Sequence, residues 1–357
     1  MTSDEPEPPG FDPAEVEQLV RLLIDLGAGE DEARSAVASL QAGPLALELS
    51  LRESEPVPFG AAADRLGMAE PDLARLWHGL GLSLPPNGQV SGDVVEALAA
   101  VRAGVAPWLG VESTQALLRL LGSTTTHIAE ALVDAFRVQI EVPTLLAGTS
   151  YVDVVKASLA LTDAALPGFE ALVAAVVRAH LVRVSAGAWS VDAGLAATRR
   201  DLFVGFVDLS GYTAIASTAS PTELATMLAR FEDITADVVT TGGGRVVKLI
   251  GDGAMFVAES PTDGCRVSLH LCERLAAEPS LPPARVGADF GSVLSRSGDY
   301  YGDVVNRAAR LVAVARPGTV VVSEPVHTAA GEGLAFEPLP AQPLKGFDTP
   351  AASFRLR

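Results

Sequence analysis

The chain has 357 residues, of which 48% are hydrophobic and 20% are charged, and its formal net charge is −18. This composition is typical of a globular protein with cores large enough for two or three domains. The acidic balance argues against nucleic acids and anionic membrane surfaces as partners, because phosphate groups are bound by clustered lysine and arginine side chains. The cysteines, Cys265 and Cys272, lie seven positions apart in a segment with helical periodicity. We therefore predict buried free thiols in a reducing compartment.

The N-terminal residues 1–12 are acidic and proline-rich, unlike a signal peptide, and we predict that they are disordered. Arg178 and Arg183 interrupt the most apolar stretch of the chain, so no apolar run reaches the roughly 18 residues that a membrane span requires. These features predict a cytoplasmic protein without a membrane span.

Helical periodicity dominates the N-terminal half. At Asp12-Pro13 a capping residue precedes a proline at the first helical position, and apolar residues then recur every three or four positions to about residue 185. The pairs Gly43-Pro44, Pro85-Pro86 and Pro167-Gly168 are predicted to separate helices. The predicted helices span residues 14–26, 30–40, 71–80, 93–101, 113–121, 125–138, 151–165 and 169–185. We predict an all-α domain over residues 13–165, followed by a linker helix and connector over 166–200.

After residue 200 short apolar strands alternate with helices. The predicted strands span residues 202–207, 245–250, 254–258, 285–294 and 319–323, with a final pair near Phe336 and Phe354. The predicted helices span residues 222–239, 262–277 and 303–315. The order strand, helix, two strands, helix, strand is that of a ferredoxin-like, split βαβ sheet. We predict one α+β domain over residues 201–357.

Two aspartates follow strands of this predicted sheet. Asp208 ends the first strand, and Asp252 lies in the Gly-Asp-Gly turn of the central hairpin. If the strands are neighbours, both carboxylates project from one edge, where they repel each other unless a cation lies between them. Such hard oxygen ligands suit Mg²⁺ or Mn²⁺. Considered singly, an Asx turn or helix cap explains Asp208, and a tight hairpin turn explains Asp252.

Other polar residues surround these positions in the predicted topology. The segment 209–213 follows the first strand and contains a glycine turn whose N–H groups can cradle phosphate, although it lacks P-loop spacing. Lys248 lies on the second strand, and Asp299 precedes the helix that carries Asn306 and Arg310. These last two are four residues apart and share a helix face, so an amide and a guanidinium can reach one substrate. A turn or a solvated helix surface explains each of these residues singly.

Taken together, the segments resemble the catalytic core of class III adenylyl cyclases. They are Phe-Val-Asp-Leu-Ser-Gly-Tyr-Thr at 206–213, Val-Lys-Leu-Ile-Gly-Asp at 247–252, and Gly-Asp-Tyr-Tyr-Gly-Asp-Val-Val-Asn-Arg-Ala-Ala-Arg at 298–310. The resemblance covers most of residues 201–357 and keeps the family's functional positions with their spacing. It implies the conversion of ATP to 3′,5′-cyclic AMP and pyrophosphate.

The resemblance also implies metal and phosphate contacts. Two Mg²⁺ or Mn²⁺ ions per active site would be held by Asp208 and Asp252, with the Leu209 carbonyl assisting. The implied substrate-binding residues of the first segment are Leu209, Ser210, Gly211, Tyr212 and Thr213. Lys345, in Leu-Lys-Gly, resembles a phosphate-contacting lysine of the family, but the Phe-Asp-Thr that follows departs from the commoner basic pattern.

Base selection is implied for Lys248 and Asp299, ribose orientation for Asn306, and phosphate stabilisation for Arg310. A guanylyl cyclase of this family typically carries Glu in place of Lys248 and Cys or Ser in place of Asp299. The chemistry agrees, because an ammonium donates to adenine N1 and a carboxylate accepts from the exocyclic amine. The family builds its active sites at the interface of a homodimer.

The N-terminal helical domain resembles the regulatory domain of soluble, pH-responsive, autoinhibited bacterial cyclases. In such relatives the domain can hold a fatty acid between helices, although a packed core explains the apolar helices equally well. His78, His127 and His180 fall in this half and supply groups that change charge near neutral pH. Regulation by pH, by a fatty acid or by both is therefore expected.

Two alternatives stay open at this point. One is a catalytically weak cyclase-like module that senses a nucleotide or a lipid. The other is a DNA-binding regulator, because residues 59–80 resemble a winged helix-turn-helix. The second helix of that segment offers Arg75 as its only basic side chain, beside Asp64, Glu70 and Asp72, whereas a DNA-binding helix needs a basic face. We therefore expect this segment to pack in the domain core.

Overall fold

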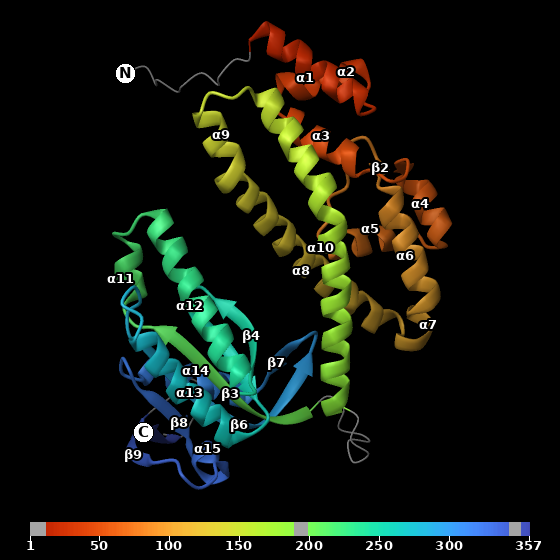
Figure 1. Cartoon of the computed structure of the whole chain (residues 1–357). Coiled ribbons are helices and arrows are strands. Elements are labelled where there is room, and N and C mark those ends of the chain that lie inside the picture. The colour runs from red at the N-terminus through yellow and green to blue at the C-terminus, as the bar shows by residue number, and fades with distance from the viewer. Residues whose placement is uncertain (1–11, 189–198, 343–350) are drawn as a thin grey trace, which may run out of the picture. The chain divides into compact units, whose positions relative to one another are not determined.

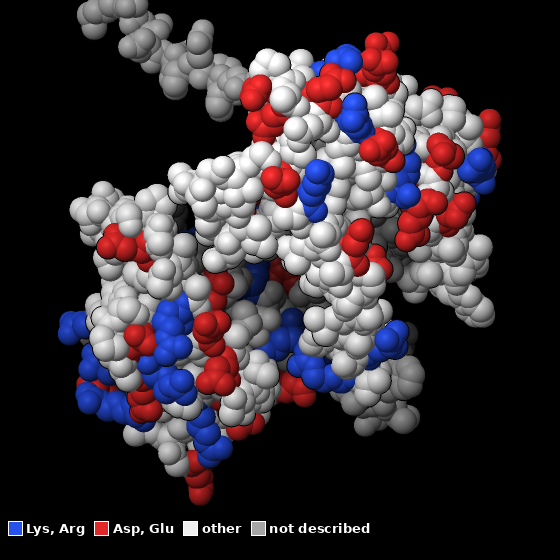
Figure 2. Space-filling view, turned by 45° about the horizontal axis from the view of Figure 1, so that its top comes forward, with Lys and Arg blue, Asp and Glu red and all other residues white. Residues whose placement is uncertain are grey.

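The computed structural model describes residues 12–188, 199–342 and 351–357. The chain divides into two compact units, residues 1–187 and 188–357. We call them the helical unit and the sheet unit and describe each by itself (Figure 1). On the face shown in Figure 2, acidic and basic side chains are interspersed over each unit, and no large basic patch is present on this face.

The first core of the helical unit joins its N-terminal helices to the start of its longest helix. Leu19, Leu23, Val152 and Val155 are buried in it. The predicted cap is confirmed, since the Asp12 side chain accepts a hydrogen bond from the Ala14 N–H at 3.1 Å. The elements of this core are α1 (Pro13–Asp25), α2 (Glu30–Ala38), α3 (Ala42–Leu51) and α10 (Tyr151–Ala188).

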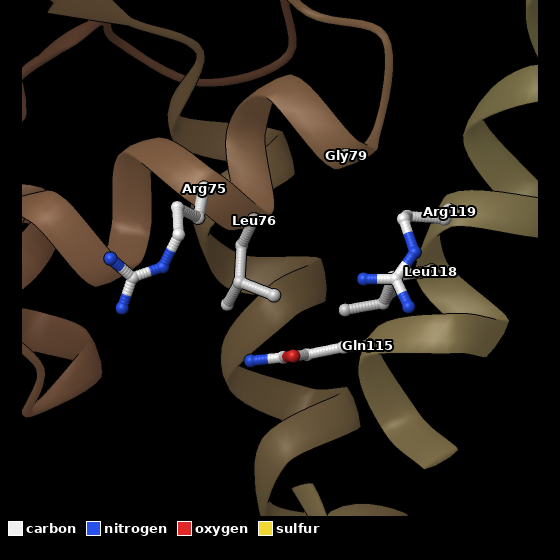
Figure 3. A pocket seen from close by; sticks show the side chains of 6 residues that line it. All are labelled: Arg75, Leu76, Gly79, Gln115, Leu118 and Arg119. Atoms are coloured by element: carbon white, nitrogen blue, oxygen red, sulfur yellow. The ribbon is translucent and has the colours of Figure 1, made fainter. Parts of the chain in front are cut away.

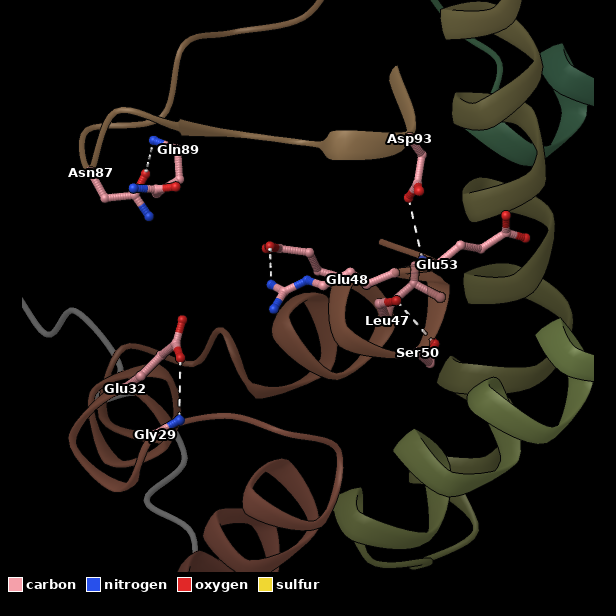
Figure 4. Close-up of polar contacts among 10 residues, drawn as sticks. Gly29, Glu32, Leu47, Glu48, Ser50, Glu53, Asn87, Gln89 and Asp93 are labelled. Atoms are coloured by element: carbon pink, nitrogen blue, oxygen red, sulfur yellow. Dashed lines mark hydrogen bonds and ion pairs between the residues drawn. The ribbon is translucent and has the colours of Figure 1, made fainter. Parts of the chain in front are cut away.

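Local polar contacts support this arrangement (Figure 4). Glu32 accepts a hydrogen bond from the Gly29 N–H at the start of α2, at 3.4 Å. Asp93 accepts one from the Glu53 N–H at 3.3 Å and so ties the segment after α3 to the start of α6 (Gly92–Gly104). Such side-chain acceptors satisfy amides that the secondary structure leaves without partners.

A second core holds the segment that resembles a helix-turn-helix. Leu73 and Trp77 are buried in it, and Arg75 forms an ion pair with Asp72. The segment therefore packs as predicted, and the basic residue of its second helix is engaged in an ion pair. The elements of this core are β1 (Val57–Pro58), α4 (Phe59–Leu66), α5 (Glu70–Gly79), β2 (Gln89–Val90), α6 (Gly92–Gly104) and α8 (Val111–Phe136), and β1 pairs with β2.

Three predicted helix boundaries in this unit are wrong. Pro167 lies inside α10, which runs through both predicted helices. The predicted helices 113–121 and 125–138 are one helix, α8, which continues into a π-helical segment, Arg137–Glu141. Gly43-Pro44 lies in the first turn of α3, where a proline is tolerated because its N–H would have no intrahelical partner. The short helices α7 (Ala106–Leu109) and α9 (Val142–Leu146) were not predicted.

The outer helices expose large apolar side chains. By length and composition α10 meets the requirement for a membrane span, since an 18-residue window has mean hydropathy 1.5 and none of it is buried. The prediction that no segment would meet this requirement is thus wrong, because Pro167 does not end the helix. One such helix is weak support for a membrane span, since soluble proteins also contain them. Exposed residues include Leu117, Leu121, Leu132 and Val133 on α8 and Leu172, Val176, Val177, Leu181 and Val182 on α10.

The sheet unit contains a mixed sheet in the order β4-β5-β3-β6-β8-β10-β9, with β7 paired to β6. The first four strands have the order and the antiparallel neighbours of the predicted split βαβ sheet. The strands are β3 (Arg199–Leu209), β4 (Arg245–Ile250), β5 (Gly253–Ala258), β6 (Ala284–Arg296), β7 (Asp299–Tyr301), β8 (Val320–Ser323), β9 (Phe336–Gln342) and β10 (Ala351–Leu356).

Helices cover both faces of this sheet (Figure 1). On one face α12 (Pro221–Thr241) and α13 (Pro261–Ala276) close the main core around Phe203, Phe231 and Phe256. On the other face α14 (Asp303–Val314) packs against β6 and β3, next to Val204. The predicted helices are therefore confirmed, whereas α11 (Tyr212–Ala216) and α15 (Glu324–Ala329) were not predicted.

Both cysteines lie in α13 as free, buried thiols, as predicted. Burial raises the pKa of the Cys265 thiol to about 12 and that of Cys272 also to about 12. Thiols in such surroundings stay protonated and unreactive at neutral pH.

Candidate active site

Asp208 and Asp252 lie close together at one end of the central strands. Asp208 belongs to β3, and Asp252 lies in the turn between β4 and β5. The Leu209 N–H donates to the Asp252 carbonyl oxygen at 3.1 Å, so the backbone fixes the two segments to each other. Burial raises the pKa of the Asp252 carboxyl, and the nearby Asp208 charge raises it further. The carboxylates thus repel each other, a condition that a bound cation relieves.

Arg285 provides the positive charge that faces Asp208. It stands directly opposite Asp208 in the antiparallel register of β3 and β6. Its Nε and Nη2 atoms lie 2.8 and 2.6 Å from Asp208 Oδ2, and its Nη1 donates to the Ala313 carbonyl oxygen at 3.4 Å. Sequence reasoning missed Arg285. The only signal was its place on the strand next to β3, and the register between the strands cannot be derived from one sequence.

Lys248 and Asp299 form a directly bonded pair. Lys248 Nζ donates to Asp299 Oδ2 at 2.5 Å, while Asp299 Oδ1 accepts from the Tyr300 N–H at 2.8 Å. Tyr300 is buried, and its hydroxyl accepts a hydrogen bond from Arg245 Nη2 at 2.7 Å. The Lys248 side chain is 42% exposed and that of Asp299 is 25% exposed. The Lys248 donor and the Asp299 acceptor therefore lie side by side. The Tyr300 N–H holds Asp299 in place, and both side chains are accessible to a ligand.

The turn after β3 leaves polar groups without protein partners. Gly211 adopts φ +84°, a conformation that glycine reaches without steric cost, and it begins α11. Within the described part of the chain, the N–H groups of Gly211, Tyr212 and Thr213 donate no hydrogen bond. The Ser210 hydroxyl is buried and also lacks a partner there. Buried polar groups are normally satisfied, so this turn is suited to a polar ligand.

Asn306 and Arg310 lie on the outer face of α14. Val304, Ala308 and Leu311 are buried on its inner face. Both Asn306 and Arg310 are exposed, and neither side chain is hydrogen-bonded or ion-paired to any other residue in the described ranges. The structure therefore brings Asp208 to Asp252 and Lys248 to Asp299, whereas the amide and guanidinium of α14 face outward.

Comparisons with known proteins show the family of the chain. The family model "Adenylate and Guanylate cyclase catalytic domain" matches residues 196–354. An uncharacterized protein of Mycobacterium tuberculosis is 32% identical over 354 residues, which cover 96% of this chain and 91% of the relative. The chain belongs to the adenylate and guanylate cyclase family.

Two further members of this cyclase family carry functional names. An adenylate cyclase of Glutamicibacter nicotianae is 29% identical over 344 residues, covering 88% of this chain and 81% of the relative. A protein of Mycobacterium tuberculosis named pH-sensitive adenylate cyclase is 28% identical over 334 residues, covering 89% and 81%. Each of these matches extends beyond the cyclase domain into the helical unit.

The carboxylates fit the divalent metal that cyclases of this family use. Among the described residues, no group of three or more His, Cys, Asp or Glu side chains could hold a metal ion. The carboxylates that could hold such a metal in this cyclase are Asp252 and Asp208, which also contacts Arg285, and nucleotide phosphates could add further oxygen ligands. Mg²⁺ is commonly held in this way, by one or two carboxylates together with substrate phosphates.

Lys345, the remaining predicted contact of the cyclase site, lies outside the described residues.

A small pocket occurs in the helical unit between α5 and α8 and is lined by Arg75, Leu76, Gln115 and Arg119 (Figure 3). Its volume of about 80 Å³ is well below the roughly 300–1,000 Å³ of typical ligand pockets. This pocket does not provide room for a fatty acid chain.

Proposed function

We propose that the protein is an adenylyl cyclase that converts ATP to 3′,5′-cyclic AMP and pyrophosphate. The observation that carries the proposal is the bonded pair of Lys248 and Asp299. Asp299 is held by the Tyr300 N–H, so its free lone pairs have a defined direction. The Lys248 ammonium can donate to adenine N1, and the Asp299 carboxylate can accept from the adenine amine. Guanine presents a donor and an acceptor in the reverse places, so this pair favours ATP.

The chain's own residues supply the remaining contacts. Asp208 and Asp252 would hold Mg²⁺ or Mn²⁺, which when bound lowers the pKa of the ribose 3′-hydroxyl and offsets triphosphate charge. The N–H groups of Gly211, Tyr212 and Thr213 and the Ser210 hydroxyl face the phosphates, with Leu209 contributing its carbonyl to the metal. Lys345 is proposed as a further phosphate contact.

Attack of the 3′-oxygen on the α-phosphorus gathers negative charge on the phosphoryl oxygens. The Arg310 guanidinium offsets that charge, and the Asn306 amide orients the ribose. Both side chains are exposed and unpaired in the described structure, so they meet the nucleotide without breaking a protein contact.

We further propose a cytoplasmic homodimer whose active sites are shared between two copies. The outward direction of Asn306 and Arg310 supports a partner site opposite α14. The large apolar side chains exposed on α8 and α10 support a second copy as their cover, because soluble proteins rarely leave large apolar patches in water. A two-fold axis makes both active sites of such a dimer equivalent.

The direct test is an assay of the purified protein with Mn²⁺ and ATP. Cyclic AMP should form, its rate should fall to background when EDTA removes the metal, and GTP should be a much poorer substrate. A protein that binds ATP with Mn²⁺ but forms no cyclic AMP would instead be a nucleotide sensor, and the proposed activity would be wrong.

We propose that the helical unit regulates this activity in response to pH. The named pH-sensitive relative matches both units, which supports the proposal. His78, His127 and His180 lie in the helical unit, and unperturbed histidine changes charge near pH 6.5. A fatty acid is a second proposed effector of this unit.

Removal of the helical unit should flatten the pH profile of cyclic AMP formation. Because β3 begins at Arg199, the truncated chain should retain residues 188–357, and the strand stays complete. The measurement is the rate between pH 5.5 and 8 for both chains, in the same buffers and at saturating Mn²⁺-ATP. If the truncated chain keeps the parent's profile, the titrating group lies in the sheet unit.

A further inference from the structure

A buried ion pair connects α14 to the sheet. Asp289 of β6 is 0% exposed, and its Oδ2 lies 3.0 Å from Arg307 Nη1. Its Oδ1 accepts hydrogen bonds from the Phe290 N–H at 2.8 Å and from the Ser323 hydroxyl. Asp289 stands opposite Val204 in the β3–β6 register and therefore faces the side of the sheet that α14 covers. Each oxygen of this carboxylate is thus engaged.

The ion pair is one of several points at which α14 meets β6, another being the bond from Arg285 Nη1 to the Ala313 carbonyl oxygen. At Gly287, an added Cβ atom would come within 1.9 Å of the Val312 nitrogen, so the helix backbone rests directly on the strand. The contact at Val312 limits how closely the helix approaches. Arg307 lies more than one helical turn before Val312, and a bond there limits the rotation of the helix about its axis.

The side chains flanking Arg307 are those proposed to act on the nucleotide. Asn306 precedes it, and Arg310 follows three residues later on the same helix. A rotation of α14 that displaced Arg307 would displace both of them by a similar angle.

We propose that Asp289 and Arg307 are positioning residues, whose ion pair sets the rotation of α14 and so directs Asn306 and Arg310 toward the nucleotide. The inference rests on the proposed function and specifies how that site is built. An apolar pair would hold the helix on the sheet as firmly, because burying charges costs free energy that their attraction rarely exceeds. A charged, hydrogen-bonded pair also fixes the orientation of the two side chains relative to each other, which apolar packing does not.

The cost of this burial is visible at the carboxyl. Burial raises the pKa of Asp289, and its bonds to Ser323 and Arg307 act in the opposite sense. A neutral residue of the same shape should therefore be tolerated by the fold. Asp289→Asn keeps an acceptor oxygen for Ser323 and for the Phe290 N–H, and it replaces the charged Oδ2 acceptor that faces Arg307 by an amide N–H donor. The Arg307 side chain is 27% exposed, so it can turn toward water.

The expected result distinguishes an effect on the position of Asn306 and Arg310 from an effect on the stability of the fold. Asp289→Asn should leave the melting temperature unchanged or higher, yet lower kcat for ATP by about tenfold or more with less than about a twofold change in KM. Arg307→Lys, which keeps the cation, should lose less. The matched control is Glu278→Gln, which removes the charge from the surface pair of Arg230 and Glu278 and should leave kcat unchanged.

Combining Asp289→Asn with Arg310→Ala tests the route of the effect. If Asp289 acts through Arg310, the fold-loss caused by Asp289→Asn should be much smaller in the Arg310→Ala background. An equal fold-loss in both backgrounds, or an unchanged kcat in Asp289→Asn, overturns the proposal.

Hydrogen exchange tests whether the Asp289–Arg307 ion pair holds α14 in place, without requiring catalytic turnover. Amide exchange in α14 should rise in Asp289→Asn while exchange in α12 stays unchanged, and unchanged exchange in α14 also overturns the proposal. Because this readout needs no turnover, it distinguishes a failure of the inference from a failure of the proposed activity.

Discussion

The combined substitution of Lys248→Glu and Asp299→Cys should lower ATP turnover by about a hundredfold or more and affect GTP turnover far less. In the structure Lys248 and Asp299 contact each other at 2.5 Å, so they present one donor and one acceptor as a unit. The substitutions replace the donor by an acceptor and remove the carboxylate acceptor. Adenine then faces groups that cannot satisfy its N1 and its amine, whereas guanine offers a donor to the new carboxylate.

The measurement is kcat/KM for ATP and for GTP with Mn²⁺, on the same preparations. Lys156→Glu is the matched control, because it makes the same charge change as Lys248→Glu at an exposed position of α10 in the other unit and should leave the ATP to GTP ratio unchanged. If ATP turnover survives the double substitution, the assignment of Lys248 and Asp299 to base selection is wrong.

The sheet unit could be predicted from the sequence to within a few residues because its signals are local. The apolar run 254–258 follows the Gly-Asp-Gly turn directly, and apolar residues recur with helical spacing over the predicted helix 222–239. Gly211 indicates the turn after Asp208, because few residues other than glycine adopt its positive φ readily. Within the described residues, the segments that carry Asp208, Asp252 and Arg310 have the predicted secondary structure, and the roles of the site residues stay predictions.

The helical unit was harder to predict, because whether a proline ends a helix depends on the exposure of the surrounding backbone. Pro167 removes one backbone donor, and the bond it would have made is to the carbonyl of Asp163. Asp163 is exposed, so water can satisfy that carbonyl and α10 continues through the proline. Nothing in the sequence around Pro167 reports that exposure.

Contacts that depend on the register between paired strands could not be predicted from the sequence. Arg285 meets Asp208, and Asp289 meets Arg307, only because β3 and β6 pair in one register and α14 crosses β6 at Gly287. A polar residue in an apolar strand is normally assigned to the solvent side. The burial of Asp289 follows instead from α14, which covers that face and supplies the counter-charge.

Mixing two inactive variants, Asp208→Ala and Arg310→Ala, should restore cyclic AMP formation. Each variant alone should lose about a hundredfold to a thousandfold in kcat, since each homodimer carries the same defect in both sites. If Asp208 belongs to one half of a site and Arg310 to the half from the partner subunit, a heterodimer collects both defects in one site and leaves the other intact. With random exchange of equal amounts, about a quarter of the wild-type activity should return.

A mixture of Asp208→Ala with Asp252→Ala is the matched control. Both aspartates belong to the same half, as the bond from the Leu209 N–H to the Asp252 carbonyl and the effect of the Asp208 charge on the pKa of Asp252 support. Every site in that heterodimer therefore keeps one defect. No activity should return, although exchange proceeds as before. Exchange itself is followed with two differently tagged chains. If tagged heterodimers form and Asp208→Ala with Arg310→Ala stays as inactive as the control mixture, the site is built within one chain and the shared-site proposal is wrong.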